Sequence, residues 1–174
     1  MREQLQCIEY CPGADKEQVE SQWVRIKGQA GRGDTVVGVY YRPPDQGKEV
    51  DEAFYRQLRA ASQSQALVVV GDFNFLDVSR KDYSASQLQS RRFLEYLDDN
   101  FLVQRVEEPT RKGALLDLIL AKKEGLVEAG KVGGCLGYSD HEVVELRISC
   151  GRNRTASRIA TLDFSRAKFG LFKQ

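Results

Sequence analysis

The chain has 174 residues and a formal net charge of +1, with 26 Lys and Arg against 25 Asp and Glu. This length favours a single domain that can bury a core, and the near-neutral balance excludes a globally basic field as a basis for nucleic-acid binding. No apolar run approaches the roughly 20 residues that cross a bilayer, and the first residues carry no signal-peptide pattern, so neither a membrane segment nor a secretory leader is expected.

Two strands joined by a glycine-rich loop are predicted first. Residues 22–27 have the pattern of a strand with one buried face. Residues 35–41, Thr-Val-Val-Gly-Val-Tyr-Tyr, are typical of a central strand buried on both faces. The intervening glycines of 28–33 favour a hairpin. Pro43 and Pro44 end the second strand, because proline cannot extend a strand ladder.

A helix and another buried strand come next. Val50, Phe54 and Leu58 recur at helical spacing, which predicts an amphipathic helix over about 50–63. Residues 66–71, Ala-Leu-Val-Val-Val-Gly, form a second apolar run of strand length. The order strand, helix, strand favours a right-handed crossover within one sheet.

The second half of the chain is also predicted to mix helix and strand. A polar loop over 76–86 precedes a helix over about 87–100, for which Ser84 or Ser86 is a suitable cap. Short strands are predicted after it at 102–106, 115–120 and 142–149. The fold class is therefore α/β, or α+β with mixed sheets.

The last 25 residues of the chain are predicted to be a basic linker and tail. The apolar pattern thins over 150–174, where basic residues gather at Arg152, Arg154, Arg158, Arg166, Lys168 and Lys173. These charges are suited either to contacting phosphates or simply to solvation. The spacing of Cys7 and Cys11 fits one of the two ligand pairs of a zinc site, but no second pair follows at matching spacing, so reduced thiols are expected.

Polar residues at the ends of buried strands are the candidates for chemistry, since ligands of α/β sheets gather there. Gly71-Asp72-Phe73-Asn74 directly follows an apolar strand. The glycine permits a sharp turn, and an acid and an amide two residues apart in extended backbone point the same way. They are suited to positioning a water and a phosphate oxygen. An ordinary Gly-Asp turn is the alternative.

Three further positions qualify. His141, the one histidine, follows Asp140 and is suited to donating to a phosphate at neutral pH, although an exposed loop histidine is equally consistent. Asp117 interrupts an apolar strand and needs a partner, such as an imidazole, unless it faces solvent. Tyr41 ends a buried strand, where its phenol would either hydrogen-bond a phosphate or simply pack.

Taken together, these motifs resemble one superfamily in their order and spacing. Tyr before Pro, Gly-Asp-x-Asn, an Asp within an apolar strand, and Ser-Asp-His resemble the endonuclease/exonuclease/phosphatase superfamily over roughly 20–149. Within this superfamily, the residues of these motifs are most similar to the endonuclease domain of LINE non-LTR retrotransposons of the jockey-like and chicken-repeat groups. That likeness is carried by Val37–Pro44, Gly71–Asn74, Glu108–Arg111 and Leu115–Leu118.

The resemblance implies a fold and a domain organisation. The fold would be part of a four-layer α/β sandwich, in which helices flank two mixed β-sheets. Residues 1–149 would be a partial domain that lacks the N-terminal strands. Residues 150–174 would lead toward a reverse transcriptase, since Ser157–Ser165 resembles the connector to that domain.

The resemblance also implies roles around a scissile DNA phosphate. Asp72 would orient or deprotonate the attacking water. Asn74 would hold the phosphate or that water, and Tyr41 would hydrogen-bond the phosphate. These roles imply DNA as the partner, without a membrane, and a nuclear location for a functional product.

A divalent metal, Mg²⁺ or Mn²⁺, would share the work with the remaining residues. His141 would contact a non-bridging oxygen, and Asp117 would orient His141. Asp140 would lie on the metal side. Such charge stabilisation is usually the largest catalytic contribution.

One element of the family pattern has no counterpart in the chain. Family members carry an earlier strand-end Glu as the principal metal ligand. Glutamates upstream of the predicted first strand are Glu3, Glu9, Glu17 and Glu20, and none follows an apolar strand. We therefore expect weakened metal binding and an incomplete sheet with an exposed edge.

Two other functions remain open from the sequence. The missing glutamate favours a catalytically inactive element product that at most binds nucleic acid. The second alternative function is that of a phosphatase of the same superfamily. The LINE-like sequence around Pro-Pro and Pro-Thr-Arg disfavours this alternative.

Overall fold

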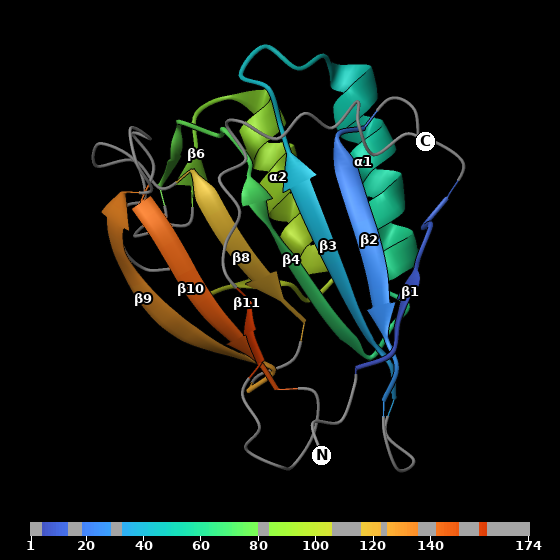
Figure 1. The fold of residues 1–174 in the computed structure, drawn as a ribbon. Helices are drawn as coiled ribbons and strands as arrows, with labels where there is room; N and C mark the ends of the chain where they lie inside the picture. The colour runs from blue at the N-terminus through green and yellow to red at the C-terminus, as the bar shows by residue number, and fades with distance from the viewer. Residues whose placement is uncertain are drawn as a thin grey trace.

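The computed structural model describes residues 5–13, 19–28, 33–79, 84–105, 116–122, 125–135, 142–149 and 157–159. Its largest sheet has six strands, which are, from edge to edge, β1 (Cys7–Glu9), β2 (Ser21–Ile26), β3 (Thr35–Tyr41), β4 (Ala66–Asp72), β8 (Asp117–Ala121) and β7 (Val103–Gln104). A second sheet has the order β11 (Ser157–Ile159), β10 (Glu142–Ile148), β9 (Val127–Cys135). Figure 1 shows the two sheets.

The centre of the large sheet is built as the sequence predicts. Strands β2 and β3 are antiparallel, which confirms the hairpin. Helix α1 (Lys48–Ala61) connects β3 to β4, and these two strands are parallel, which confirms the crossover within one sheet. Strand β8 then pairs antiparallel with β4, so the sheet is mixed.

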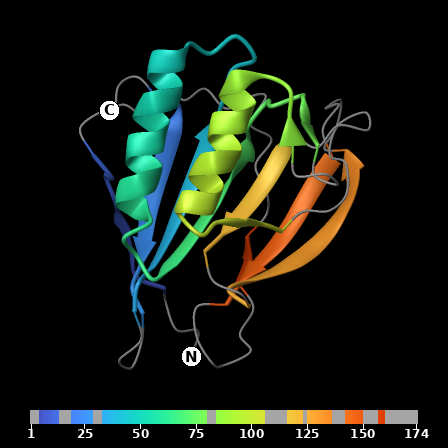
Figure 2. The ribbon, with the colours of Figure 1, turned by 180° about the vertical axis from the view of Figure 1, so that it is seen from behind.

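The helices and the second sheet cover opposite faces of the large sheet. Figures 1 and 2 show α1 and α2 (Leu88–Asp99) together on one face. Successive side chains of a strand point to opposite faces, so Val36 and Leu67 pack in the core under the helices. Their neighbours Val37 and Val68 pack in the core shared with the second sheet. The α/β sandwich prediction is thereby confirmed.

Several strands were not predicted from the sequence. β9 contains Gly130, Gly133 and Gly134, which break the apolar alternation that marks a strand. The loop predicted over 76–86 contributes β5 (Val78–Ser79) and β6 (Ser84–Ala85), which pair with each other. β11 lies within the segment predicted as a linker and pairs with β10.

Helix α2 is capped by a residue outside it, and the expected serine cap is wrong. The N-cap position is Gln87, whose side chain makes no capping hydrogen bond. The Asp77 carboxylate instead accepts from the Gln87 N–H at 2.6 Å, from Ser86 Oγ at 3.0 Å and from Ser90 Oγ. Burial alone would raise the pKa of Asp77, but these hydrogen bonds hold it below its ordinary value. A carboxylate ten residues earlier in the chain therefore accepts the backbone N–H of the N-cap residue and lies at the positive end of the helix dipole.

Neither described helix is both long and apolar enough to cross a membrane.

Candidate active site

Three of the predicted site residues lie side by side on adjacent strands. Tyr41 on β3 is opposite Asp72 on β4, and Asp72 is opposite Asp117 on β8. Directly paired residues of neighbouring strands project from the same face of a sheet. We call Tyr41, Asp72 and Asp117 the site row.

The site row faces the side of the sheet that the smaller sheet covers. Val70 and Ile119, two residues from Asp72 and Asp117 along their strands, belong to the core between the two sheets. Side chains two apart on a strand share a face. The row therefore lies at the end of that inter-sheet core, where the apolar side chains stop.

The two carboxylates of the row are held close by the ladder. The Phe73 N–H donates to the Leu116 carbonyl at 2.9 Å, so the pair next to Asp72 and Asp117 is the hydrogen-bonded one. Asp72 and Asp117 consequently form a non-hydrogen-bonded pair, in which the side chains approach more closely. Asp72 is buried and Asp117 is half-buried. Like charges directly opposite are unfavourable, so this placement favours positive charge nearby.

Asn74 joins the row through hydrogen bonds rather than through an extended backbone. β4 ends at Asp72, and Asn74 has a φ of 49°, so the premise of an extended Asp-Phe-Asn segment is wrong. Asparagine tolerates this left-handed conformation better than most residues. The Asn74 N–H donates to Asp72 Oδ1 at 3.2 Å, and Asn74 Nδ2 donates to the Arg42 carbonyl at 2.7 Å. The amide is thus fixed beside Asp72.

Gly71 allows the backbones of β3 and β4 to approach closely, in addition to any role in turning the chain. It lies within β4, opposite Tyr40. A Cβ on Gly71 would sit 1.7 Å from the Tyr40 carbonyl oxygen, which is backbone and cannot swing aside. A side chain at this position would therefore push β3 from β4 where the site row is formed.

A buried ion pair behind the row was missed by sequence reasoning. Arg42 Nε and Nη2 donate to the two carboxylate oxygens of Asp51 at 2.9 and 3.0 Å, and each residue is 3% exposed. Gln46 Nε2 lies 2.7 Å from Asp51 Oδ1 and 2.8 Å from the Tyr40 hydroxyl. A charged residue just after a strand normally points to solvent, so the sequence carries no signal of this burial.

Asp140 and His141 lie outside the described residues, as do Glu3 and Glu17. β10 begins at Glu142, the residue after His141 in the chain. The pairing of His141 with Asp117 and the metal role of Asp140 therefore stay predictions.

Glu20 lies beside the row, which sequence reasoning did not anticipate. Its carbonyl accepts from the Tyr41 N–H at 2.9 Å. Glu20 precedes β2, and the antiparallel pairing of β2 with β3 brings that start to the end of β3. A pattern of residues that follow apolar strands cannot indicate Glu20, because Glu20 precedes its strand.

The described residues fit a divalent cation only in part. Mg²⁺ commonly takes one or two protein carboxylates and keeps several waters, which Asp72 and Asp117 could satisfy. Within the described ranges, however, no three His, Cys, Asp or Glu side chains come together as a metal site.

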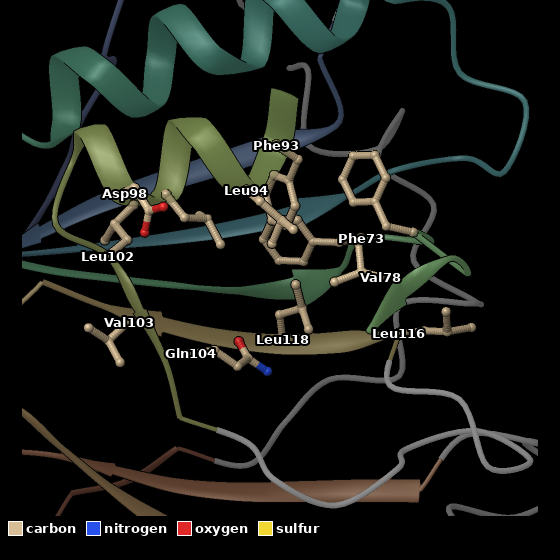
Figure 3. A pocket seen from close by; sticks show the side chains of 12 residues that line it. Phe73, Val78, Phe93, Leu94, Asp98, Leu102, Val103, Gln104, Leu116 and Leu118 are labelled. Carbon is tan, nitrogen blue, oxygen red and sulfur yellow. The ribbon is translucent and has the colours of Figure 1, made fainter. Parts of the chain in front are cut away.

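An apolar cavity of about 280 Å³ lies between α2 and strands β8 and β7. Phe73, Phe93 and Leu118 line it, as Figure 3 shows, with Asp98 and Gln104 among its polar groups. Phe73 belongs to the core under the helices, on the opposite face from the site row. The cavity is thus separate from the candidate active site.

The fold is similar to those of several solved structures. The endonuclease domain of TRAS1, a telomere-specific non-LTR retrotransposon, matches with a TM-score of 0.62 and 19% identity, over 83% of this chain and 67% of that chain. The human Nocturnin catalytic domain with bound sulfate matches with a TM-score of 0.48 and 15% identity, over 74% of this chain and 53% of that chain. A search among curated proteins found no match.

The family model described as endonuclease-reverse transcriptase matches residues 35–145, more than half of the chain. The chain therefore belongs to this family, and its place in the endonuclease/exonuclease/phosphatase superfamily, on the LINE retrotransposon side, is as predicted. Membership makes it a nuclease-type domain. The matched segment includes the positions Tyr41, Asp72, Asn74, Asp117, Asp140 and His141.

Proposed function

We propose that this domain is a metal-dependent endonuclease that nicks DNA, with the site row at its reaction centre. The observation that supports this most is the strand register, which gathers Tyr41, Asp72 and Asp117 at one end of the sheet. Each residue comes from a different strand, and the matched family segment contains all of them.

In this proposal the described residues handle the attacking water and the phosphate. Asp72, buried and next to a second carboxylate, orients the water and accepts its proton. Asn74 holds the same water or a phosphate oxygen, with its amide already fixed by Arg42. The Tyr41 phenol donates a hydrogen bond to the phosphate. Donors and acceptors held in place before the substrate arrives cost little reorganisation during the reaction.

The remaining roles fall on residues outside the described ranges. His141 would contact a non-bridging phosphate oxygen, Asp117 would orient its imidazole, and Asp140 would bind the metal. A bound Mg²⁺ or Mn²⁺ would supply positive charge to the phosphate.

The family and the similar structure support a proposal for the substrate and the partner domain. The family name joins an endonuclease to a reverse transcriptase, and TRAS1 is a retrotransposon. We therefore propose DNA as substrate and a reverse transcriptase domain in the parent element. With a net charge of only +1, DNA binding would depend on local basic residues and weaken as salt rises.

A plasmid assay tests this function. The protein would be incubated with supercoiled plasmid and Mg²⁺ or EDTA, beside His141→Ala. We expect the wild-type protein to produce nicked circles in the presence of Mg²⁺ and not in the presence of EDTA. His141→Ala should lose most of the nicking, because the phosphate loses a charged donor.

Two other outcomes would overturn the proposal. Salt-sensitive DNA binding without nicking would point to the inactive binder instead. Phosphate release from a soluble phosphoinositide headgroup, without nicking, would point to the sister phosphatase.

A further inference from the structure

Arg42 links the candidate active site to helix α1 through both its backbone and its side chain. The Arg42 N–H donates to the Asp72 carbonyl at 2.9 Å, and the Arg42 carbonyl accepts from Asn74 Nδ2 at 2.7 Å. Its guanidinium binds Asp51, in the first turn of α1, through two hydrogen bonds. Arg42 thus binds the Gly-Asp-Phe-Asn segment through its backbone, and Asp51 fixes Arg42 through its side chain.

The guanidinium is fixed on more than one side. The Arg42 Cζ atom lies 4.4 Å from the centroid of the Phe75 ring, one residue after Asn74. Asp51 is in turn bound by Gln46, which also contacts the Tyr40 hydroxyl. A planar, two-pronged guanidinium on a carboxylate fixes direction as well as distance. The position of the Arg42 backbone is therefore set by a rigid, buried network.

This network determines how Asn74 presents its amide. A carbonyl oxygen can only accept, so the group that meets the Arg42 carbonyl must be Nδ2 and cannot be Oδ1. Asn74 Oδ1 then points away from Arg42. An Asn74 free to flip would instead offer either oxygen or nitrogen to a ligand.

We propose that Arg42 is a positioning residue, whose buried pairing with Asp51 holds its own carbonyl so that Asn74 is locked in one orientation beside Asp72. The proposal rests on the proposed nuclease function for its effect on rate. The locking itself is a property of the folded chain and can be measured without substrate.

The sharpest variant replaces the whole ion pair. Removing Arg42 alone would leave the Asp51 charge buried without its partner and destabilise the fold. Arg42→Met with Asp51→Leu replaces both by apolar groups of similar size, a change that is often neutral for stability. The matched control is Arg92→Met with Glu52→Leu, which removes a more exposed pair between α2 and the residue next to Asp51.

Two readouts follow from the proposal. In the Arg42/Asp51 double variant, the Asn74 side-chain NH₂ signals in an NMR spectrum should exchange faster with water and lose their distinct shifts. The kcat for nicking should fall on the order of 10- to 100-fold, with KM for DNA little changed, because a misplaced group costs rate more than binding. The control pair should alter neither. Arg42→Lys, which keeps the charge but cannot form the two parallel hydrogen bonds of a guanidinium, should give intermediate effects on the Asn74 signals and on kcat.

Unchanged Asn74 side-chain signals in the folded double variant would overturn the proposal, whatever the activity. If the double variant does not fold, the same signals in Arg42→Lys decide, and wild-type behaviour there overturns it equally. A wild-type protein that fails to nick would contradict the proposed function alone, since the NMR comparison needs no catalysis.

Discussion

Gly71→Ala is expected to destabilise the domain by about 3 kcal/mol and to abolish any activity of the site. The added Cβ would lie 1.7 Å from the Tyr40 carbonyl oxygen, a contact that only backbone movement can relieve. That movement would separate β3 from β4 at the point where Tyr41 meets Asp72. Urea denaturation followed by circular dichroism would measure the loss.

Gly38→Ala provides the comparison, because it adds the same methyl group to the adjacent strand. Its Cβ would meet the Trp23 ring at 2.4 Å, and a side chain can shift more readily than a strand. We expect a smaller loss, about 1 to 2 kcal/mol, with the site row intact. A Gly71→Ala protein as stable as wild type would contradict the close approach described here.

Asp72→Asn is expected to lower the rate of nicking by about 10²- to 10⁴-fold, the range that general bases contribute. The amide keeps an oxygen that can accept from the Asn74 N–H, so the loop should keep its shape. What it loses is the negative charge and the ability to take a proton. Single-turnover plasmid nicking with Mg²⁺, together with a thermal melt, separates lost chemistry from lost folding.

The control for this variant is Asp99→Asn, the same chemical change at an exposed position that ends α2. It should nick at the wild-type rate. If Asp72→Asn also nicked at that rate, Asp72 would not be the base, and the site row would lose its central member.

The central sheet was predictable because its strands are unambiguous. The apolar runs before Tyr41 and Asp72 have no competing helical pattern, and Pro43 stops the first of them. The helix between them has clear apolar spacing. The end-of-strand rule selects both Tyr41 and Asp72, and the register places them opposite each other.

The position of Asp117 was harder to predict. Its strand is evident, but only pairing with β4 shows that Asp117 lies opposite Asp72. Register depends on contacts between segments far apart in the chain, and a shift of one residue would have moved Asp117 to the other face.

Neither the buried ion pair of Arg42 and Asp51 nor the cap of α2 by Asp77 had a local signal in the sequence. Arg42, Asp51 and Asp77 are charged residues that would ordinarily be solvated. Arg42 and Asp51 are buried because each satisfies the other, and Asp77 caps a helix that begins eleven residues later. Such pairings exist only in the folded chain, so a pattern along the sequence cannot show them.

A manganese titration followed by NMR tests the central claim most directly, since it asks where the cation binds rather than what the protein cleaves. Paramagnetic Mn²⁺ broadens the signals of nuclei near it. If the site row is the reaction centre, the backbone amide signals of Tyr41, Asp72 and Asp117 should broaden at lower Mn²⁺ than those of Asp98 and Asp99, the adjacent acids on α2. Broadening that begins at Asp98 and Asp99, or that leaves the site row unaffected, would contradict the account.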